Sequence, residues 1–190
     1  EVNINHNSFN LHGWFINREI SSENPLIIYY GGNAEEISHN LFNLEKYEKE
    51  SLLFMNYRGY GKSTGSPSQS SLYSDALFIL DHISDTYSIP STNIILMGRS
   101  LGSAVATYVA KQRHVKAVIL ITPFDSLVNI AKEHYPFFPV KLLLRHPFNS
   151  VQIAPEIISP MIAIIADQDK IIANEKSINL VEQWGIKSHY

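Results

Sequence analysis

Residues 93–102, NIILMGRSLG, decide the fold. The first five form a short apolar run between Pro90 and Gly98, which predicts a buried parallel strand. The last five read G-x-S-x-G, the pattern of a serine on a sharp turn between a strand and a helix. Residues 101–110 are small and apolar, as is typical of a helix lying close against a sheet. The motif therefore stands in the strand-turn-helix context that it requires.

The two glycines of this motif have a steric reason. Gly98 and Gly102 lie two residues before and two residues after Ser100, where side chains would collide as the strand and the helix converge. A nucleophile at so sharp a turn has strained backbone with φ above zero. A bare G-x-S-x-G also occurs by chance in loops, so the surrounding strand and helix carry the prediction that Ser100 is a nucleophile.

Composition excludes several classes of function. The chain has 190 residues, 45% apolar and 17% charged, an ordinary balance for a globular domain with its own core. Lys and Arg are scattered and the net charge is −3, so no nucleic-acid partner is predicted. The absence of cysteine excludes disulfides, a thiolate nucleophile and a cysteine-based metal site. No histidine or carboxylate cluster has metal-ligand spacing, and no apolar run approaches the length of a membrane span.

Apolar runs alternate with helical spacing along most of the chain. Strands are predicted at 26–30, 51–56, 93–97, 115–121 and 161–165, and helices at 36–49, 69–86, 101–110 and 174–184. This alternation is typical of an α/β fold with a parallel sheet. Residues 1–20 predict one or two antiparallel edge strands that turn at His12–Gly13, and residues from 188 onward predict the start of a further strand.

Four motifs follow one another in the order found in the α/β-hydrolase superfamily. They are YGGNA at 30–34, NYRGYGKS at 56–63, GRSLG at 98–102 and ADQDKII at 166–172. Together they resemble the compact serine hydrolases of the abhydrolase-domain type, which include protein depalmitoylases and related esterases. The resemblance covers nearly the whole chain. It implies a mostly parallel central sheet with helices on both faces, one domain over residues 1–190, and a small cap after the sixth strand at about residues 123–150.

The resemblance also implies a catalytic set and no cofactor. In this superfamily the chain order is serine, acid, histidine, with Ser100 as the nucleophile. The acid follows the strand at 161–165, where Asp167 and Asp169 both stand. The family pattern places the acid before one residue and two β-branched positions, which selects Asp169 and leaves Asp167 as a turn residue. Asp125 is an outside candidate whose position beside Ser126 predicts a helix N-cap.

An oxyanion hole requires backbone N–H groups aimed at the developing negative charge. One donor is the amide of Leu101, the residue after the nucleophile. By resemblance the second is the amide of Asn33, which follows Gly31 and Gly32. The family usually has His-Gly at these two positions, so the support of the loop differs here. The alternative is an ordinary glycine turn without a catalytic role.

The base is the missing member of this set. Of eight histidines only His189 follows Asp169, and it stands where the last central strand is predicted to begin. Five residues of strand span about 16 Å, which places a histidine at the start of that strand too far from Ser100. We therefore expect the catalytic histidine beyond Tyr190, and a chain that lacks the end of its domain and is by itself a weak enzyme. Chain order alone leaves His189 as the alternative base. His134 and His146, in the cap region, are interpreted as surface or cap-packing residues.

These patterns together predict a serine hydrolase that cleaves an ester, thioester or related acyl bond of a small-molecule or acylated substrate. The rival from another class is a non-catalytic binding module of the same fold, which the missing histidine motivates. The aromatic residues of 123–150 are consistent with an apolar acyl site and equally with the packing of the cap itself.

Overall fold

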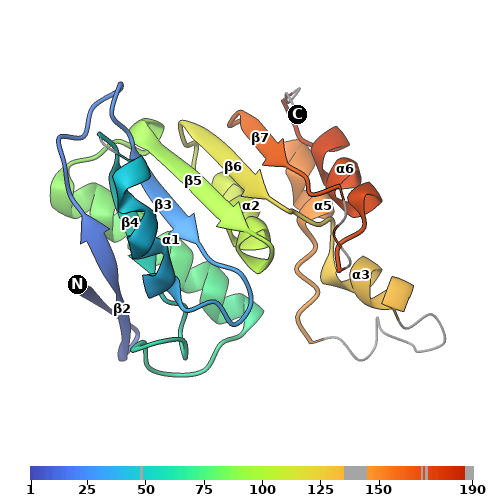
Figure 1. Ribbon diagram of the computed structural model, residues 1–190, viewed down its shortest axis with the longest axis horizontal. Helices are drawn as coiled ribbons and strands as arrows, with labels where there is room; N and C mark the ends of the chain where they lie inside the picture. Colours follow the sequence, from blue (N-terminus) through green and yellow to red (C-terminus); the bar gives the residue numbers. More distant parts are fainter. Residues whose placement is uncertain (48, 135–144, 168, 170, 187–190) are drawn as a thin grey trace.

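The computed structural model describes residues 1–190 except 48, 135–144, 168, 170 and 187–190 (Figure 1). Seven strands form one sheet in the order β1-β2-β4-β3-β5-β6-β7. The strands are β1 (Val2–His6), β2 (Phe9–Ile16), β3 (Leu26–Tyr30), β4 (Ser51–Met55), β5 (Ile94–Arg99), β6 (Ala117–Ile121) and β7 (Met161–Ile164). The helices are η1 (Ile37–Lys46), α1 (Gln69–Tyr87), η2 (Ser91–Asn93), α2 (Leu101–Gln112), α3 (Leu127–His134), α5 (Ser150–Ile153), η3 (Ala154–Glu156) and α6 (Asn174–Glu182).

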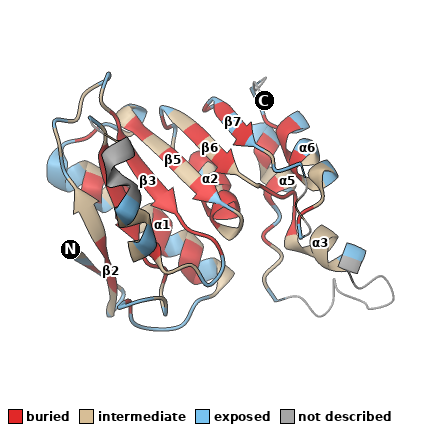
Figure 2. Ribbon diagram, in the orientation of Figure 1, coloured by how far each residue is buried: buried red, intermediate tan, exposed pale blue. Residues whose placement is uncertain are grey.

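The sheet is mostly parallel, which confirms the predicted fold class. β4, β3, β5, β6 and β7 run parallel to their neighbours, while β1 and β2 join the β4 edge as an antiparallel hairpin. The strands β3 and β4 are buried along their whole length, as Figure 2 shows in red for β3. Strands covered on both faces have continuous apolar sequences, and this is why the predicted strands at 26–30 and 51–56 agree with β3 and β4 to within one residue.

Helices cover both faces of this sheet. One face carries the larger apolar cluster, in which Leu80 of α1, Val105 of α2 and Trp184 after α6 are buried. The other face carries a smaller cluster, in which Ile37 of η1 lies with Phe54 of β4. The predicted helix at 36–49 is a 3-10 helix over Ile37–Lys46, in which Asn40 Nδ2 also donates to the carbonyl of Ile37.

The predicted turn at His12–Gly13 is wrong. The hairpin turns at Asn7 and Ser8, whose φ angles are +48° and +67°, the values of a tight two-residue hairpin turn. Gly13 lies inside β2, opposite Met55 of β4. A Cβ at Gly13 would lie 2.1 Å from the carbonyl oxygen of Phe54, so this glycine permits close strand approach and does not mark a turn.

A buried ion cluster ties the hairpin to α1. The Asp75 carboxylate accepts hydrogen bonds from Arg58 Nε at 3.0 Å and Nη2 at 2.5 Å, and it lies 2.7 Å from Nδ1 of His6. The Arg58 guanidinium lies over the Phe9 ring, and the His6 ring stacks on Phe78. The carboxylate is 4% exposed, so removal of it would leave a buried arginine without its counter-charge.

Two predictions fall partly or wholly outside the described residues. The strand expected from residue 188 onward lies there entirely, and so does His189. The cap-like segment at 123–150 is described at 123–134 and 145–150, where α3 and the start of α5 lie.

Candidate active site

Ser100 stands at the sharp junction between β5 and α2. Its backbone has φ +50° and ψ −115°, a conformation that non-glycine residues rarely adopt. Its amide donates to the carbonyl of Ile121 at the end of β6, 2.9 Å away. A Cβ at Gly102 would lie 2.0 Å from the carbonyl oxygen of Tyr30, and one at Gly98 would lie 2.3 Å from that of Gly102. The two glycines therefore let α2 start directly against the sheet.

The serine side chain is free of local bonds. Among the residues that the structure describes, Ser100 Oγ has no hydrogen-bond partner, while its carbonyl accepts from the Oγ of Ser103 at 2.6 Å. Leu101 is the first residue of α2, so its N–H has no partner within the helix and points out of the helix N-terminus. This end of a helix carries a partial positive charge, which favours an anion beside it.

Two tyrosines hold the loop that follows β3. Tyr57 Oη donates to the carbonyl of Gly31 at 2.9 Å. Burial raises the pKa of Tyr57 well above its usual range, so this phenol remains a donor. Tyr60 Oη donates to the side-chain oxygen of Asn33 at 2.9 Å and accepts from the amide of Ala34 at 3.3 Å. The amide of Asn33 itself has no acceptor among the described residues.

A carboxylate holds the same loop from the other side. Glu35 Oε2 accepts from the amide of Gly32 at 2.5 Å and lies 2.8 Å from Nη2 of Arg99. Glu35 Oε1 accepts from Tyr29 Oη at 3.0 Å and from Asn40 Nδ2 at 2.9 Å. Partial burial acts to raise the pKa of Glu35, but these hydrogen bonds and the guanidinium outweigh it and hold that pKa below its usual value. Glu35 is therefore an anion at neutral pH.

Asp169 and Asp167 have different surroundings. Asp169 lies on the wall of the same cavity as Ser100, and its Oδ1 accepts from the amides of Ile171 at 2.8 Å and Ile172 at 3.0 Å. These bonds leave its second oxygen available to an imidazole. Asp167 is exposed and accepts from Asn174 Nδ2 at 3.4 Å. Asp169 is thus the one of the two that borders the serine's cavity.

Asp125 is engaged in structural bonds. Its side chain is buried, and Oδ1 accepts from the amide of Ser126 at 2.6 Å. Oδ2 accepts from Asn129 of α3 at 2.7 Å and from Asn179 of α6 at 2.9 Å. With its oxygens occupied in this way, Asp125 connects α3 to α6 and does not line the serine's cavity.

Three histidines were candidates near the site or after Asp169 in sequence. His189 lies outside the described residues, and His134 ends α3. His146 lines the cavity together with Ser100 and Asp169, and its Nδ1 accepts from the amide of Gln69 at 3.4 Å. Within the described part of the chain no histidine is hydrogen bonded to Ser100 Oγ. The sequence predicts that His146 is a surface or cap-packing residue, and the structure shows that it also borders this cavity.

The cavity beside Ser100 has a volume of about 1200 Å³. Most of its wall is apolar, and it also includes the polar groups described above. The apolar lining comes mainly from Leu72, Leu101, Ile121, Phe124, Leu127, Ile130, Phe148, Ile171 and Ile172. The charged lining comes from Arg99, Arg145 and Asp169. Such a cavity suits a ligand with an apolar body and a polar end.

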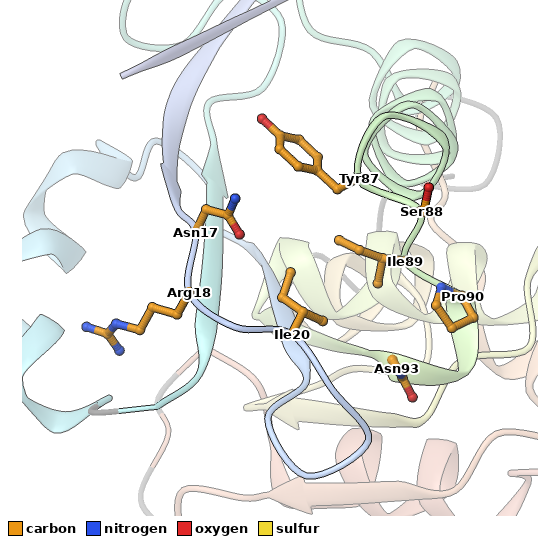
Figure 3. Close-up of a pocket in the computed structure, with 8 residues that line it drawn as sticks. All are labelled: Asn17, Arg18, Ile20, Tyr87, Ser88, Ile89, Pro90 and Asn93. Atoms are coloured by element: carbon orange, nitrogen blue, oxygen red, sulfur yellow. The ribbon is translucent and has the colours of Figure 1, made fainter.

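A second cavity of about 220 Å³ lies between the end of β2 and the segment after α1 (Figure 3). Its charged member, Arg18, is bonded to the carbonyls of Tyr47 and Glu50. The described residues that line it include neither a carboxylate nor a histidine, so they offer no acid-base set. No group of three potential metal ligands occurs in the described parts of the chain, and no helix described there is long and apolar enough to cross a membrane.

Sequence reasoning missed the supports of the site. Arg99 stands inside the G-x-S-x-G motif and Glu35 directly after the YGGNA motif, yet the pairing of the two is a tertiary contact. The tyrosines of the NYRGYGKS motif, Tyr57 and Tyr60, have no role that the sequence alone assigns. Their bonds to residues 31–34 give the reason for this loop, and only a fold that brings the ends of β3 and β4 together creates them.

Comparisons with known proteins agree with the geometry. Residues 24–152 match the family described as the alpha/beta hydrolase fold. The chain is 33% identical over 181 residues to the alpha/beta hydrolase domain-containing protein WAV2 of Arabidopsis thaliana, covering 85% of this chain and 58% of that protein. It is 31% identical over 177 residues to the uncharacterized protein Rv2307c of Mycobacterium tuberculosis, covering 90% of this chain and 62% of that protein. The chain thus spans about three fifths of the length of these relatives.

Solved structures show the same fold at low sequence identity. Est1E of Butyrivibrio proteoclasticus, solved with ferulic acid, superposes with a TM-score of 0.78 at 16% identity, over 100% of this chain and 87% of that one. A monoacylglycerol lipase of Paleococcus ferrophilus superposes with a TM-score of 0.68 at 17% identity, over 93% of this chain and 85% of that one.

Proposed function

The chain belongs to the α/β-hydrolase family, and from this premise we propose that it is a serine hydrolase that cleaves an ester, thioester or related acyl bond. Family membership supports hydrolase activity in general. The observation that carries the finer proposal is the position of Ser100. Its strained backbone presents an unbonded hydroxyl beside a helix N-terminus and a cavity of about 1200 Å³.

In the proposed reaction Ser100 Oγ attacks the acyl carbonyl and forms a tetrahedral intermediate. The amides of Leu101 and Asn33 donate to its oxyanion. Support comes from the bonding pattern, since Gly32 and Ala34 are bonded to Glu35 and Tyr60 while the Asn33 amide is open. A donor of this kind contributes about 10²–10³ in kcat. Collapse of the intermediate releases the leaving group and leaves an acyl-enzyme, which water then hydrolyses.

A histidine takes the proton of Ser100 and later returns it to the leaving group. Asp169 orients that histidine through the carboxylate oxygen that Ile171 and Ile172 leave free. His189 is the histidine of this chain that follows Asp169 in sequence. The protein needs no cofactor for this chemistry.

The cavity wall suggests the kind of substrate. We propose that segment 123–150 acts as a cap, because the partly exposed Leu127 and Ile130 line the serine's cavity. Phe124 and Phe148, which are buried, stand behind the same wall. An acyl chain placed there would bury apolar area against these side chains. The substrate is therefore a small molecule or an acylated molecule whose acyl group is apolar.

A series of p-nitrophenyl esters with acyl chains from two to sixteen carbons tests this proposal. The full-length protein should hydrolyse them, and Ser100→Ala should abolish hydrolysis because the covalent step is lost. The control is Ser70→Ala, an exposed serine of α1, which should keep wild-type rates. If wild type binds the esters without turnover, the binding-module alternative stands instead. If wild type hydrolyses the esters and Ser100→Ala stays within about tenfold of it, Ser100 is not the nucleophile.

A further inference from the structure

One oxygen of Glu35 touches both halves of the proposed catalytic machinery. Glu35 Oε2 accepts from the amide of Gly32 at 2.5 Å and lies 2.8 Å from Nη2 of Arg99. Gly32 directly precedes Asn33, the proposed oxyanion donor. Arg99 directly precedes Ser100, the proposed nucleophile. A single carboxylate therefore joins the loop after β3 to the residue at the end of β5.

The other oxygen anchors this carboxylate to the body of the fold. Glu35 Oε1 accepts from Tyr29 Oη on β3 at 3.0 Å and from Asn40 Nδ2 on η1 at 2.9 Å. The side chain is 10% exposed. Four donors on two oxygens fix its position, and charge-assisted hydrogen bonds are the strong ones in proteins.

The two glycines of the loop make room for this arrangement. A Cβ at Gly31 would lie 3.3 Å from Cδ of Glu35, and one at Gly32 would lie 3.3 Å from its Oε2. Both distances are tighter than ordinary contacts between a methyl group and a carboxylate. The loop thus carries Gly-Gly in place of the His-Gly pair implied by the family resemblance, and the support comes from a residue outside the pair.

We propose that Glu35 is a positioning residue that sets the distance between Ser100 and the oxyanion donor, an inference that rests on the proposed function. By accepting from the Gly32 amide, Glu35 fixes the peptide between Gly31 and Gly32, one peptide before the one that carries the Asn33 amide, and leaves the Asn33 amide as the open donor. By pairing with the Arg99 guanidinium, it holds the side chain of the residue directly before the nucleophile. A misplacement of about 1 Å in such a pair costs up to about 10² in rate.

The test compares Glu35→Ala with wild type in the full-length protein, using two readouts. These are kcat and KM for p-nitrophenyl butyrate, and the rate of Ser100 phosphonylation by a fluorophosphonate. We expect kcat and the phosphonylation rate to fall by about 10–100-fold, with KM within about threefold of wild type. Glu36→Ala is the matched control, because it removes the same charge from a neighbour that accepts from the amide of Ser38. The kcat, KM and phosphonylation rate of Glu36→Ala should equal those of wild type.

A small carboxylate separates positioning from general stability. Sodium formate should restore at least about a third of the phosphonylation rate of Glu35→Ala, because it can occupy the vacated space and accept the same bonds. Sodium chloride at equal ionic strength should not. Loss without rescue by formate, or a rate equal to wild type, overturns the proposal. If Glu35→Ala does not fold, Glu35→Gln decides, with a loss of about tenfold expected and a wild-type rate as the contradicting result.

The two proposals fail in different ways. A wild-type protein that neither hydrolyses esters nor reacts with the fluorophosphonate removes the proposed function, and the role of Glu35 with it. A wild-type protein that reacts at Ser100 while Glu35→Ala reacts equally fast removes only the role of Glu35.

Discussion

Gly102→Ala tests the close contact between α2 and the sheet. A Cβ at this position would lie 2.0 Å from the carbonyl oxygen of Tyr30, which is a backbone atom of β3. Relief would require α2 to move away from the sheet, although its buried face includes Ala104, Val105 and Val109. Overpacking of this kind costs about 3 kcal/mol. Alanine returns at most about 1 kcal/mol through its helix propensity, so the free energy of unfolding should fall by about 2 kcal/mol or more.

For a chain of this size, that loss lowers Tm by about 4–8 °C. Urea unfolding followed by circular dichroism gives the free energy, and a thermal scan gives Tm. Gly32→Ala is the matched control, because its Cβ would meet side-chain atoms in place of backbone, at 3.3 Å from Oε2 of Glu35 and 3.6 Å from the guanidinium of Arg99. It should cost less than about 1 kcal/mol. If Gly102→Ala is as stable as wild type, the steric reason given for the G-x-S-x-G glycines is wrong.

Three further predictions concern carboxylates. Asp169→Asn should lower kcat by up to about 10⁴-fold, because the asparagine favours the wrong tautomer of the catalytic imidazole, whereas Asp167→Asn should change kcat little. Ester hydrolysis kinetics in the reverse order would exchange the roles of the two aspartates. The folded-state pKa of Glu35 is lowered from 4.5, so its contribution to stability is present above that pH and is lost as the pH falls below it. Urea titrations should therefore show the free energies of unfolding of wild type and Glu35→Gln converging in acid. Asp75→Ala should lower the free energy of unfolding in urea by about 3–5 kcal/mol, because it leaves Arg58 without its counter-charge. Asp81→Ala breaks an ion pair at the surface and should lower it by less than about 1 kcal/mol. Equal losses for the two variants would contradict the burial argument.

The sequence predicted those parts of the molecule that local rules determine. The strand at 93–97, the turn at Ser100 and the following helix lie within twenty residues, and their apolar periodicity and glycine spacing are steric requirements of the turn itself. The runs at 26–30 and 161–165 are equally local, and the observed β3 and β7 match them within one residue. Motif order along these elements was enough to predict the fold class.

The hairpin at the start of the chain shows where local signals mislead. The His12–Gly13 pair predicted a turn. Gly13 is instead required by the close approach of Phe54, on a strand some forty residues later. The actual turn uses Asn7 and Ser8, a pair with weaker turn preference than Asn-Gly. Contacts between strands determined this outcome, and the sequence of residues 1–20 does not contain them.

The supports of the site were beyond sequence reasoning for the same reason. Glu35 reads as one acidic residue among several, and Arg99 reads as the variable position of a motif. Their pairing exists only because β3 and β5 are neighbours in the sheet and end at the same edge. Tyr60 likewise gains its role from the loop that it meets across that edge.

Peptide mapping after fluorophosphonate labelling tests the central claim most directly. The native full-length protein should gain one phosphonyl group, and mass spectrometry of its peptides should place that group on Ser100. Protein unfolded by heat before the reaction should gain none, because the unfolded hydroxyl has neither a base nor an oxyanion hole. Native protein that remains unlabelled, or that carries the group on another serine, would contradict the assignment of Ser100 as a nucleophile.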